Sequence, residues 1–316
     1  MKATLKRLLP ENLLNILRFA RSRAAKGIDY PREFAQDLAR YIRHSGPDDQ
    51  GVRASSHFKH IEMQLTKDYH RVEKGLALAA PRRPFGNALM DRLELLVPAA
   101  ELTPTGRGEY VAHARDALSA LKKWNSGGDV TDLVSPEVEV DRPHIPAEEF
   151  FKSRHSIRNF SHKPVDQAVF HEAVELALHS PSVCNRQPWK IRFYNTPEAV
   201  RQALSFQNGN SGFGQTTPAA ALITVDLRLF AGAGERNQAW IEGGIFSMSL
   251  VWALHALGID SCMLNMSLPN KKISNLRRDL NVEDNELVVM FIAMGYGAAG
   301  RRRARSPRRG IDEVAL

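Results

Sequence analysis

Three polar residues at alternating positions stand out near the middle of the sequence. The segment SRHSIRNF covers residues 153–160 and places Arg154, Ser156 and Arg158 two residues apart. Alternate side chains of an extended segment lie on one face, so two guanidinium groups and a hydroxyl would point the same way. Like charges held this close repel each other unless an anion lies between them. The spacing therefore predicts an anion-binding site.

A second stretch combines amides with an aromatic residue. The segment SPSVCNRQPWKIRFYN, residues 180–195, carries Asn185 and Gln187 before Pro188 and Trp189. Amides both donate and accept hydrogen bonds, so a stiff turn bearing them suits a flat heterocycle with carbonyls and ring nitrogens. The same residues also fit an ordinary Asn/Ser/Pro turn that precedes a strand. Taken alone, this stretch does not decide between the two.

The first part of the chain predicts helices. Apolar residues recur at spacings of three and four throughout residues 1–125, which is typical of helices with one buried face. A Gly pair then interrupts the pattern, and the acidic, Pro-containing residues 126–146 predict a linker or wrapping segment. The expected helices are 11–25, 31–44, 56–75, 86–98 and 107–124.

From residue 147 onward, predicted helices and strands are mixed. Asp166 is placed to cap a helix that follows it, and Gly258 is placed to end a long apolar helix over 236–257. Regular strand–helix–strand units do not recur, which favours an α+β fold over a doubly wound sheet. The expected strands are 190–195, 219–226 and 286–297.

Composition limits the classes of partner and compartment. Two cysteines are too few for a disulfide framework, so we expect a reducing, cytoplasmic location. The net charge of +8 is local, because RRRARSPRR at 301–309 holds six arginines, so we expect no nucleic-acid partner. The N-terminus lacks the uninterrupted apolar stretch of a secretory signal, and no segment reaches the length of a membrane span.

Together, the two polar segments resemble the nitroreductase family of flavin oxidoreductases. RHSIRNF, a predicted helix and then PSVCNRQPW carry the resemblance. Three further stretches support it: EGGIFSMSLVWALHALGID at 242–260, SCMLNM at 261–266 and MGYGAAGRRRARSPRRGIDEV at 294–314. The resemblance covers residues 147–316. It implies a nitroreductase-like α+β fold, with a central, mainly antiparallel sheet flanked by helices, preceded here by an all-helical N-terminal region.

The resemblance also implies which residues hold a cofactor. The anion would be the phosphate of FMN, contacted by Arg154, with His155 and Ser156 at the phosphate, ribityl chain or ring edge and Arg158 near flavin N1/O2. Positive charge there stabilises the reduced ring and tunes its potential. The family builds each site from two subunits of a homodimer. The remaining residues implied are Pro181, Ser182, Val183, Asn185 and Gln187 from the partner subunit, Leu264, Asn265 and Met266 along the ring, Asn208 or Asn210 from a Gly-rich loop, and Arg305 or Arg308 from the tail.

The implied activity is an FMN-dependent NAD(P)H oxidoreductase, a flavoprotein that uses NADH or NADPH. Hydride would pass through flavin N5 in a ping-pong cycle to an electron-poor nitro compound or quinone, with no catalytic side chain required. Two alternatives stay open. One is a specialised flavin enzyme of the same fold that oxidises a biosynthetic intermediate. The other is a non-catalytic binding protein whose helical half recruits partners.

Two other kinds of chemistry are weaker hypotheses. His57, His60, Glu62, His70 and Glu73 are close in sequence, but no closed set of metal ligands emerges, so we expect no metal. No base and orienting acid can be assigned to Ser182, so hydrolysis is not expected.

Overall fold

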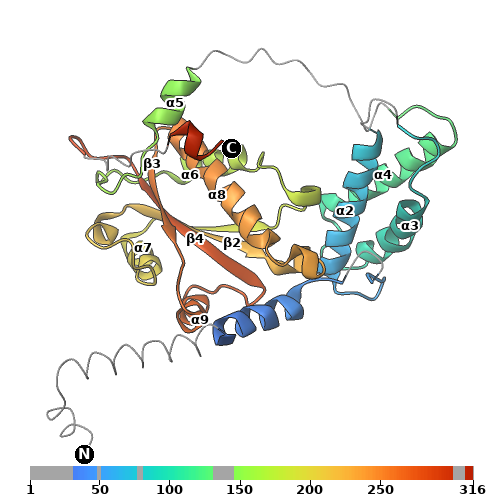
Figure 1. Ribbon diagram of the computed structural model, residues 1–316, viewed down its shortest axis with the longest axis horizontal. Coiled ribbons are helices and arrows are strands. Elements are labelled where there is room, and N and C mark those ends of the chain that lie inside the picture. Colours follow the sequence, from blue (N-terminus) through green and yellow to red (C-terminus); the bar gives the residue numbers. More distant parts are fainter. Residues whose placement is uncertain (1–30, 48–50, 77–80, 131–145, 302–309, 316) are drawn as a thin grey trace, which may run out of the picture.

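The computed structural model describes residues 31–47, 51–76, 81–130, 146–301 and 310–315 (Figure 1). The predicted helix 11–25, most of the predicted linker and both Arg305 and Arg308 lie outside these residues. Within the described part of the chain, no helix is long and apolar enough to cross a bilayer.

A four-stranded antiparallel sheet forms the centre of the C-terminal region. Its strands are β1 (Trp189–Tyr194), β2 (Ala219–Asp226), β3 (Asp260–Asn265) and β4 (Glu286–Gly295), in the order β1-β2-β4-β3. Every residue of β2 is buried, because layers of helices cover both faces of the sheet. The antiparallel pairing confirms the expected α+β class and the three predicted strands.

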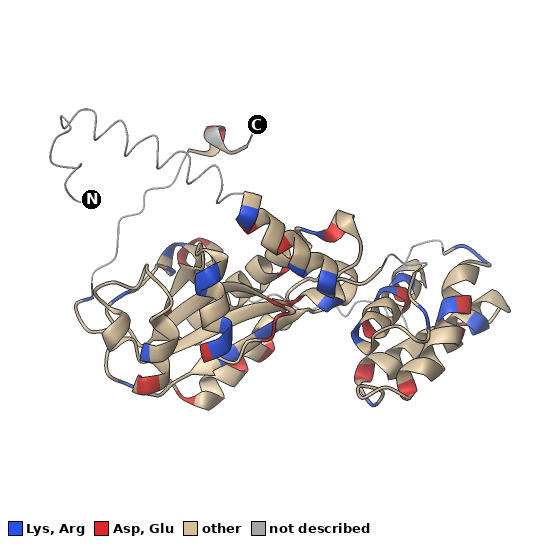
Figure 2. Cartoon of the chain, turned by 90° about the horizontal axis from the view of Figure 1, so that it is seen from below, with Lys and Arg blue, Asp and Glu red and all other residues tan. Residues whose placement is uncertain are grey.

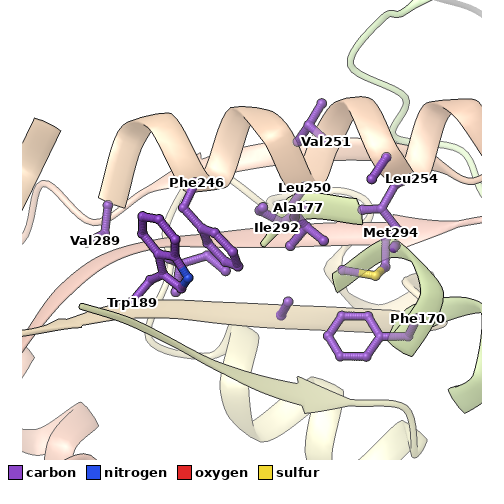
Figure 3. Close-up of a cluster of buried hydrophobic side chains, with 14 of the residues drawn as sticks. Phe170, Ala177, Trp189, Phe246, Leu250, Val251, Leu254, Val289, Ile292 and Met294 are labelled. Carbon is purple, nitrogen blue, oxygen red and sulfur yellow. The ribbon is translucent and has the colours of Figure 1, made fainter. Parts of the chain in front are cut away.

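Helices of opposite faces enclose two separate cores. Helices α6 (Gln167–Ala177) and α8 (Gln238–Ala256) pack on one face, where Trp189 stacks on Phe246 at 4.8 Å (Figure 3). Helices α7 (Pro197–Leu204) and α9 (Asn270–Asp279) pack on the other face, around Phe291. Alternate residues of β2 belong to opposite cores, as the two-residue period of a strand requires.

Local signals set the ends of these helices. The Asp166 carboxylate accepts a hydrogen bond from the Ala168 N–H at 2.9 Å, so it caps α6 as predicted. Gly258 follows α8 with φ of 74°, a left-handed conformation that costs glycine little. Ile259 N–H then bonds the Leu254 carbonyl at 2.8 Å and closes the helix end.

The N-terminal part is helical, as expected. Helices α2 (Phe58–Leu76), α3 (Asn87–Glu101) and α4 (Glu109–Asn125) share a core of their own and form a lobe beside the sheet region (Figures 1 and 2). Leu229 and Ala231 of the sheet region belong to the same core, so the lobe is packed against it. Figure 2 also shows acidic and basic residues intermixed on both parts.

The helix over residues 31–44 lies against the sheet region at another place. The Tyr41 hydroxyl donates to the Gly232 carbonyl at 2.8 Å, and the Gly46 N–H donates to the Phe230 carbonyl at 2.8 Å. The Asp284 carboxylate accepts from Arg43 at 3.0 Å and from His44 at 2.9 Å. A short helix, α5 (Ala147–Ser153), precedes the first polar segment.

Candidate functional site

The first polar segment runs along the free edge of β3. Ser156 forms a parallel bridge with Ser261, and the Ile157 N–H bonds the Ser261 carbonyl at 3.0 Å. Ile157 is buried beneath the sheet, whereas Ser156 is half-buried and Arg158 is exposed. The bridge to Ser261 agrees with the extended conformation expected from the sequence, but burial does not alternate from 154 to 160.

The two arginines of this segment lie in different surroundings. The Arg154 guanidinium lies 5.7 Å from the Trp252 ring centroid on α8. Arg158 instead lines a hollow of about 410 Å³ with Asn159, Ser211, Gly212, Phe213 and Gly300. Neither guanidinium pairs with a carboxylate among the residues that the structure describes. An unpaired cation at an open hollow, as at Arg158, suits an anionic ligand.

The second polar segment is a backbone turn of unusual conformation. Cys184, Asn185 and Gln187 have φ of 50°, 53° and 47°, all in the left-handed region that residues other than glycine seldom adopt. The Ser182 hydroxyl accepts from the Gln187 N–H at 2.9 Å, which closes the turn. Such conformations cost free energy and persist only when surrounding contacts hold them.

Arg186 supplies those contacts, and sequence reasoning missed it. Its buried guanidinium donates to the Leu229 carbonyl at 2.8 Å and to both oxygens of Glu235, at 2.7 and 3.0 Å. Burial raises the pKa of Glu235, but the hydrogen bonds from Arg186 and the Ala231 N–H outweigh it and lower the pKa overall. No signal in the sequence links Arg186 with a carboxylate 49 residues away.

Glu242 holds the same turn from α8. It is buried, and its Oε1 accepts from the Val183 N–H at 2.7 Å and from Gln238 Nε2 at 3.2 Å. Its Oε2 has no hydrogen-bond partner within the described residues. The turn therefore rests on two buried side chains, of which one carries an unused acceptor.

The two polar segments contact α8 at well-separated positions. Val183 bonds Glu242 near the start of the helix, whereas Arg154 lies against Trp252 near its end. Ten residues of helix separate these contacts by about 15 Å. One FMN-sized ligand that touches both segments therefore needs either the whole length of α8 or a second copy of the chain.

Leu264 and Asn265 end β3, and Met266 follows it. The side chains of Leu264 and Met266 are buried in the core of the α7 and α9 face, and only Asn265 is exposed. The Asn265 carbonyl accepts from Gln207 Nε2 at 2.8 Å, which ties β3 to the Gly-rich loop. Burial raises the pKa of the neighbouring Cys262, so that thiol is not activated.

Other predicted residues fall at the edges of this region. Asn210 donates to the Leu204 carbonyl at 2.8 Å and lines a second hollow of about 350 Å³ with Gln207 and Gly214. His155 and Ser156 are half-buried, as are Ser182 and Asn185, whereas Pro181 and Gln187 are exposed. These positions leave the predicted set of FMN contacts a prediction.

The helical lobe reaches the same turn. Tyr69 of α2 is buried, and burial raises the pKa of its hydroxyl, partly offset by hydrogen bonds with Thr66 and Asn185. The sequence gives no sign of this contact, since the two residues are far apart along the chain. No group of three potential metal ligands occurs among the described residues, including those of α2.

Residues 151–206 and 198–296 match the family model described as the Nitroreductase family. The C-terminal region of this chain belongs to the nitroreductase family. The predicted membership and the nitroreductase-like fold are thereby confirmed, and the family match supports an oxidoreductase.

Individual relatives cover about half of the chain. A Burkholderia lata protein, named among the NADH dehydrogenases/NAD(P)H nitroreductases, is 27% identical over 187 residues, which are 53% of this chain and 94% of the relative. Nitroreductase NfnB of Mycolicibacterium smegmatis is 27% identical over 215 residues, covering 53% of this chain and 91% of that protein. A nitroreductase structure from Desulfovibrio desulfuricans, solved with FMN, has a TM-score of 0.48 and 19% identity and covers 55% of this chain and 97% of that one.

Proposed function

We propose that the nitroreductase domain binds FMN and transfers electrons from NADH or NADPH to an electron-poor acceptor, such as a nitro compound or a quinone. FMN, when bound, supplies hydride acceptance and donation at N5. The observation that supports the proposal is the pair of arginines on the β3 edge, which lack carboxylate partners among the described residues. The names of two curated relatives, which include NADH or NAD(P)H, support the nicotinamide donor.

Each residue of the β3 edge has a distinct role in this proposal. Arg154 would neutralise the phosphate, with Ser156 and His155 beside it. Arg158 would place positive charge near N1/O2, where it stabilises negative charge on the reduced ring without moving a proton. Asn265 would face the ring edge, and the tail arginines at 305 and 308 remain candidates for the phosphate.

The partner subunit would complete the site. Helix α8 exposes a row of apolar residues at helical spacing: Ile241 and Ile245 are 52% and 36% exposed, and Met248 and Trp252 continue the row. A two-fold contact along this row would bring the Ser182–Gln187 turn of one subunit toward the β3 edge of the other. The separation of the two segments along α8 then follows from a site shared between copies.

Steady-state turnover separates the proposal from its alternative. We expect NADH or NADPH to reduce the bound flavin without oxygen, and a nitroaromatic or quinone to reoxidise it with parallel double-reciprocal plots. A bound flavin that no nicotinamide reduces would instead favour the specialised flavin enzyme. The hydrogen bond between Tyr69 and Asn185, which links the helical lobe to the Ser182–Gln187 turn, supports that alternative.

A further inference from the structure

A cavity of about 230 Å³ lies beyond the C-terminal end of β3, where the helix over 31–44 meets α9. Its polar walls come from these two helices and its apolar walls come from α8, β4 and the residues after β3. The covering helix lies outside the residues that match the nitroreductase family. The lining residues are Glu33, Asp37, Arg40, Trp240, Met266, Ser267, Leu268, Asn270, Ile273, Arg277, Leu287 and Val288.

Arg277 has hydrogen-bonding capacity that the described residues do not use. It is 7% exposed, and its Nη2 donates to the Glu286 carbonyl. Its Nε and Nη1 have no partner within the described part of the chain. A buried guanidinium with unused donors costs free energy that an acceptor in the cavity would recover.

The other polar and charged side chains of the cavity already pair with one another through hydrogen bonds and ion pairs. Asn270 donates to Glu33 at 2.9 Å and to Asp37 at 3.1 Å, and its Oδ1 accepts from Arg40 at 2.9 Å. Arg40 also lies 3.8 Å from Asp284. The two acids and two arginines of the lining carry no net charge, so one added negative charge is tolerated better than two. This balance favours a carboxylate over a phosphate dianion.

The apolar walls indicate the rest of the ligand. Trp240, Met266, Leu268, Ile273, Leu287 and Val288 line the same space. One water occupies about 30 Å³ of liquid volume, so the cavity is several times larger than a water that bridges Arg277 requires. An apolar body of aromatic-ring size fits these walls and leaves its charged end at the guanidinium.

We propose that this cavity binds a small monocarboxylate with an apolar body, whose carboxylate accepts hydrogen bonds from Nε and Nη1 of Arg277. A planar guanidinium offers two parallel donors to a carboxylate, which a lysine cannot do. Because Glu33, Asp37 and Arg40 form one wall, binding also stabilises the docked position of the 31–44 helix. The proposal needs no flavin.

Calorimetric titration of the full-length protein with benzoate tests the proposal. Benzamide serves as a neutral ligand of the same shape, and inorganic phosphate as a different anion. We expect benzoate alone to bind, and Arg277→Gln to weaken it at least tenfold. Arg278→Gln is the matched control, because Arg278 is exposed on the same helix and pairs with Asp279. The affinity of Arg278→Gln for benzoate should equal that of the wild type.

Crystals soaked in 4-bromobenzoate keep the test decisive if Arg277→Gln fails to fold. We expect an anomalous bromine peak between Trp240 and Leu287, in apo and flavin-containing protein alike. A bromine peak elsewhere, ordered water alone on Arg277, or phosphate binding in place of benzoate would overturn the proposal. A protein that binds benzoate but cannot take up added FMN would contradict the proposed function and leave the proposal for this cavity standing.

Discussion

Arg186 and Glu235 are joined by two parallel hydrogen bonds of 2.7 and 3.0 Å, which anchor the Ser182–Gln187 turn. The Arg186 side chain is fully buried and Glu235 is a quarter exposed. The pair fixes the position of a backbone that contains three left-handed residues. A local strain is therefore held by an ion pair from a distant part of the chain.

Removal of Arg186 should destabilise the protein strongly. Arg186→Ala leaves Glu235 without its charged partner, and breaking such a pair costs about 3 kcal/mol or more. Urea unfolding should show this loss. Arg201→Ala is the control: its pair with Glu198 is exposed and should contribute less than about 1 kcal/mol. Equal losses in the two variants would mean that Arg186 is not a structural anchor.

The protein should tolerate loss of the Glu242 charge, but not loss of the oxygen that accepts from the Val183 N–H. Glu242→Gln keeps an acceptor for the Val183 N–H and removes a buried carboxylate oxygen that has no partner within the described residues. We expect it to change the free energy of unfolding by less than about 1 kcal/mol, whereas Glu242→Ala should cost about 1–3 kcal/mol. If Gln and Ala destabilise alike, the charge itself is required.

Acid should weaken the fold through Glu286. Burial raises the pKa of this carboxyl, but hydrogen bonds from Arg192 at 2.7 and 2.8 Å and from Thr224 dominate and lower it from 4.5 to about 2. Its folded pKa is below its unfolded pKa, so its contribution is complete above 4.5. That contribution, about 3 kcal/mol, is lost as the pH falls from 4.5 toward 2.

Urea unfolding at several pH values between about 3 and 7 measures this dependence. Glu286→Gln should be less stable at neutral pH and should lose less stability on acidification than the wild type. Glu283→Gln, at a more exposed carboxyl, is the control and should follow the wild-type curve. Parallel curves for wild type and Glu286→Gln would refute the assignment.

A charge in the apolar row of α8 should separate the subunits. Ile245→Glu places a carboxylate at the centre of the proposed contact, so light scattering should report a monomer and the purified protein should contain less flavin. Leu102→Glu changes a residue that is 90% exposed on the helical lobe and should leave the mass unchanged. A dimer that survives Ile245→Glu would place the interface elsewhere.

Arg158 should affect the redox chemistry more than binding. Arg158→Gln removes positive charge near the proposed N1/O2 position, so the flavin potential should fall and reduction should slow. Potentiometric titration and stopped-flow reduction measure these quantities, and fluorescence titration measures FMN affinity. If affinity alone falls while potential and rate stay unchanged, Arg158 contacts the phosphate instead.

The sequence predicted the structural features that depend on residues close together in the chain. The Asp166 cap, the end of α8 at Gly258 and the strand 219–226 depend on short-range chemistry and a two-residue period, and all three are confirmed. The family resemblance was also readable, since two short segments carry it. These features require no knowledge of which distant segments meet.

Contacts between distant segments could not be predicted in this way. The sequence indicates only that Arg186 is one residue of a turn, because nothing near it identifies Glu235 as its partner. The docking of the 31–44 helix depends on Asn270, and the burial of Arg277 with two unused donors depends on the packing of α9. Tertiary packing determines which partners these charged side chains meet.

The visible spectrum of the protein as purified tests the central claim most directly. We predict a yellow protein whose released chromophore is FMN, bound at one per subunit. Added FMN should restore colour to stripped protein and raise its Tm, because a ligand of the native state stabilises it by mass action. A colourless protein whose Tm does not respond to FMN would contradict the account.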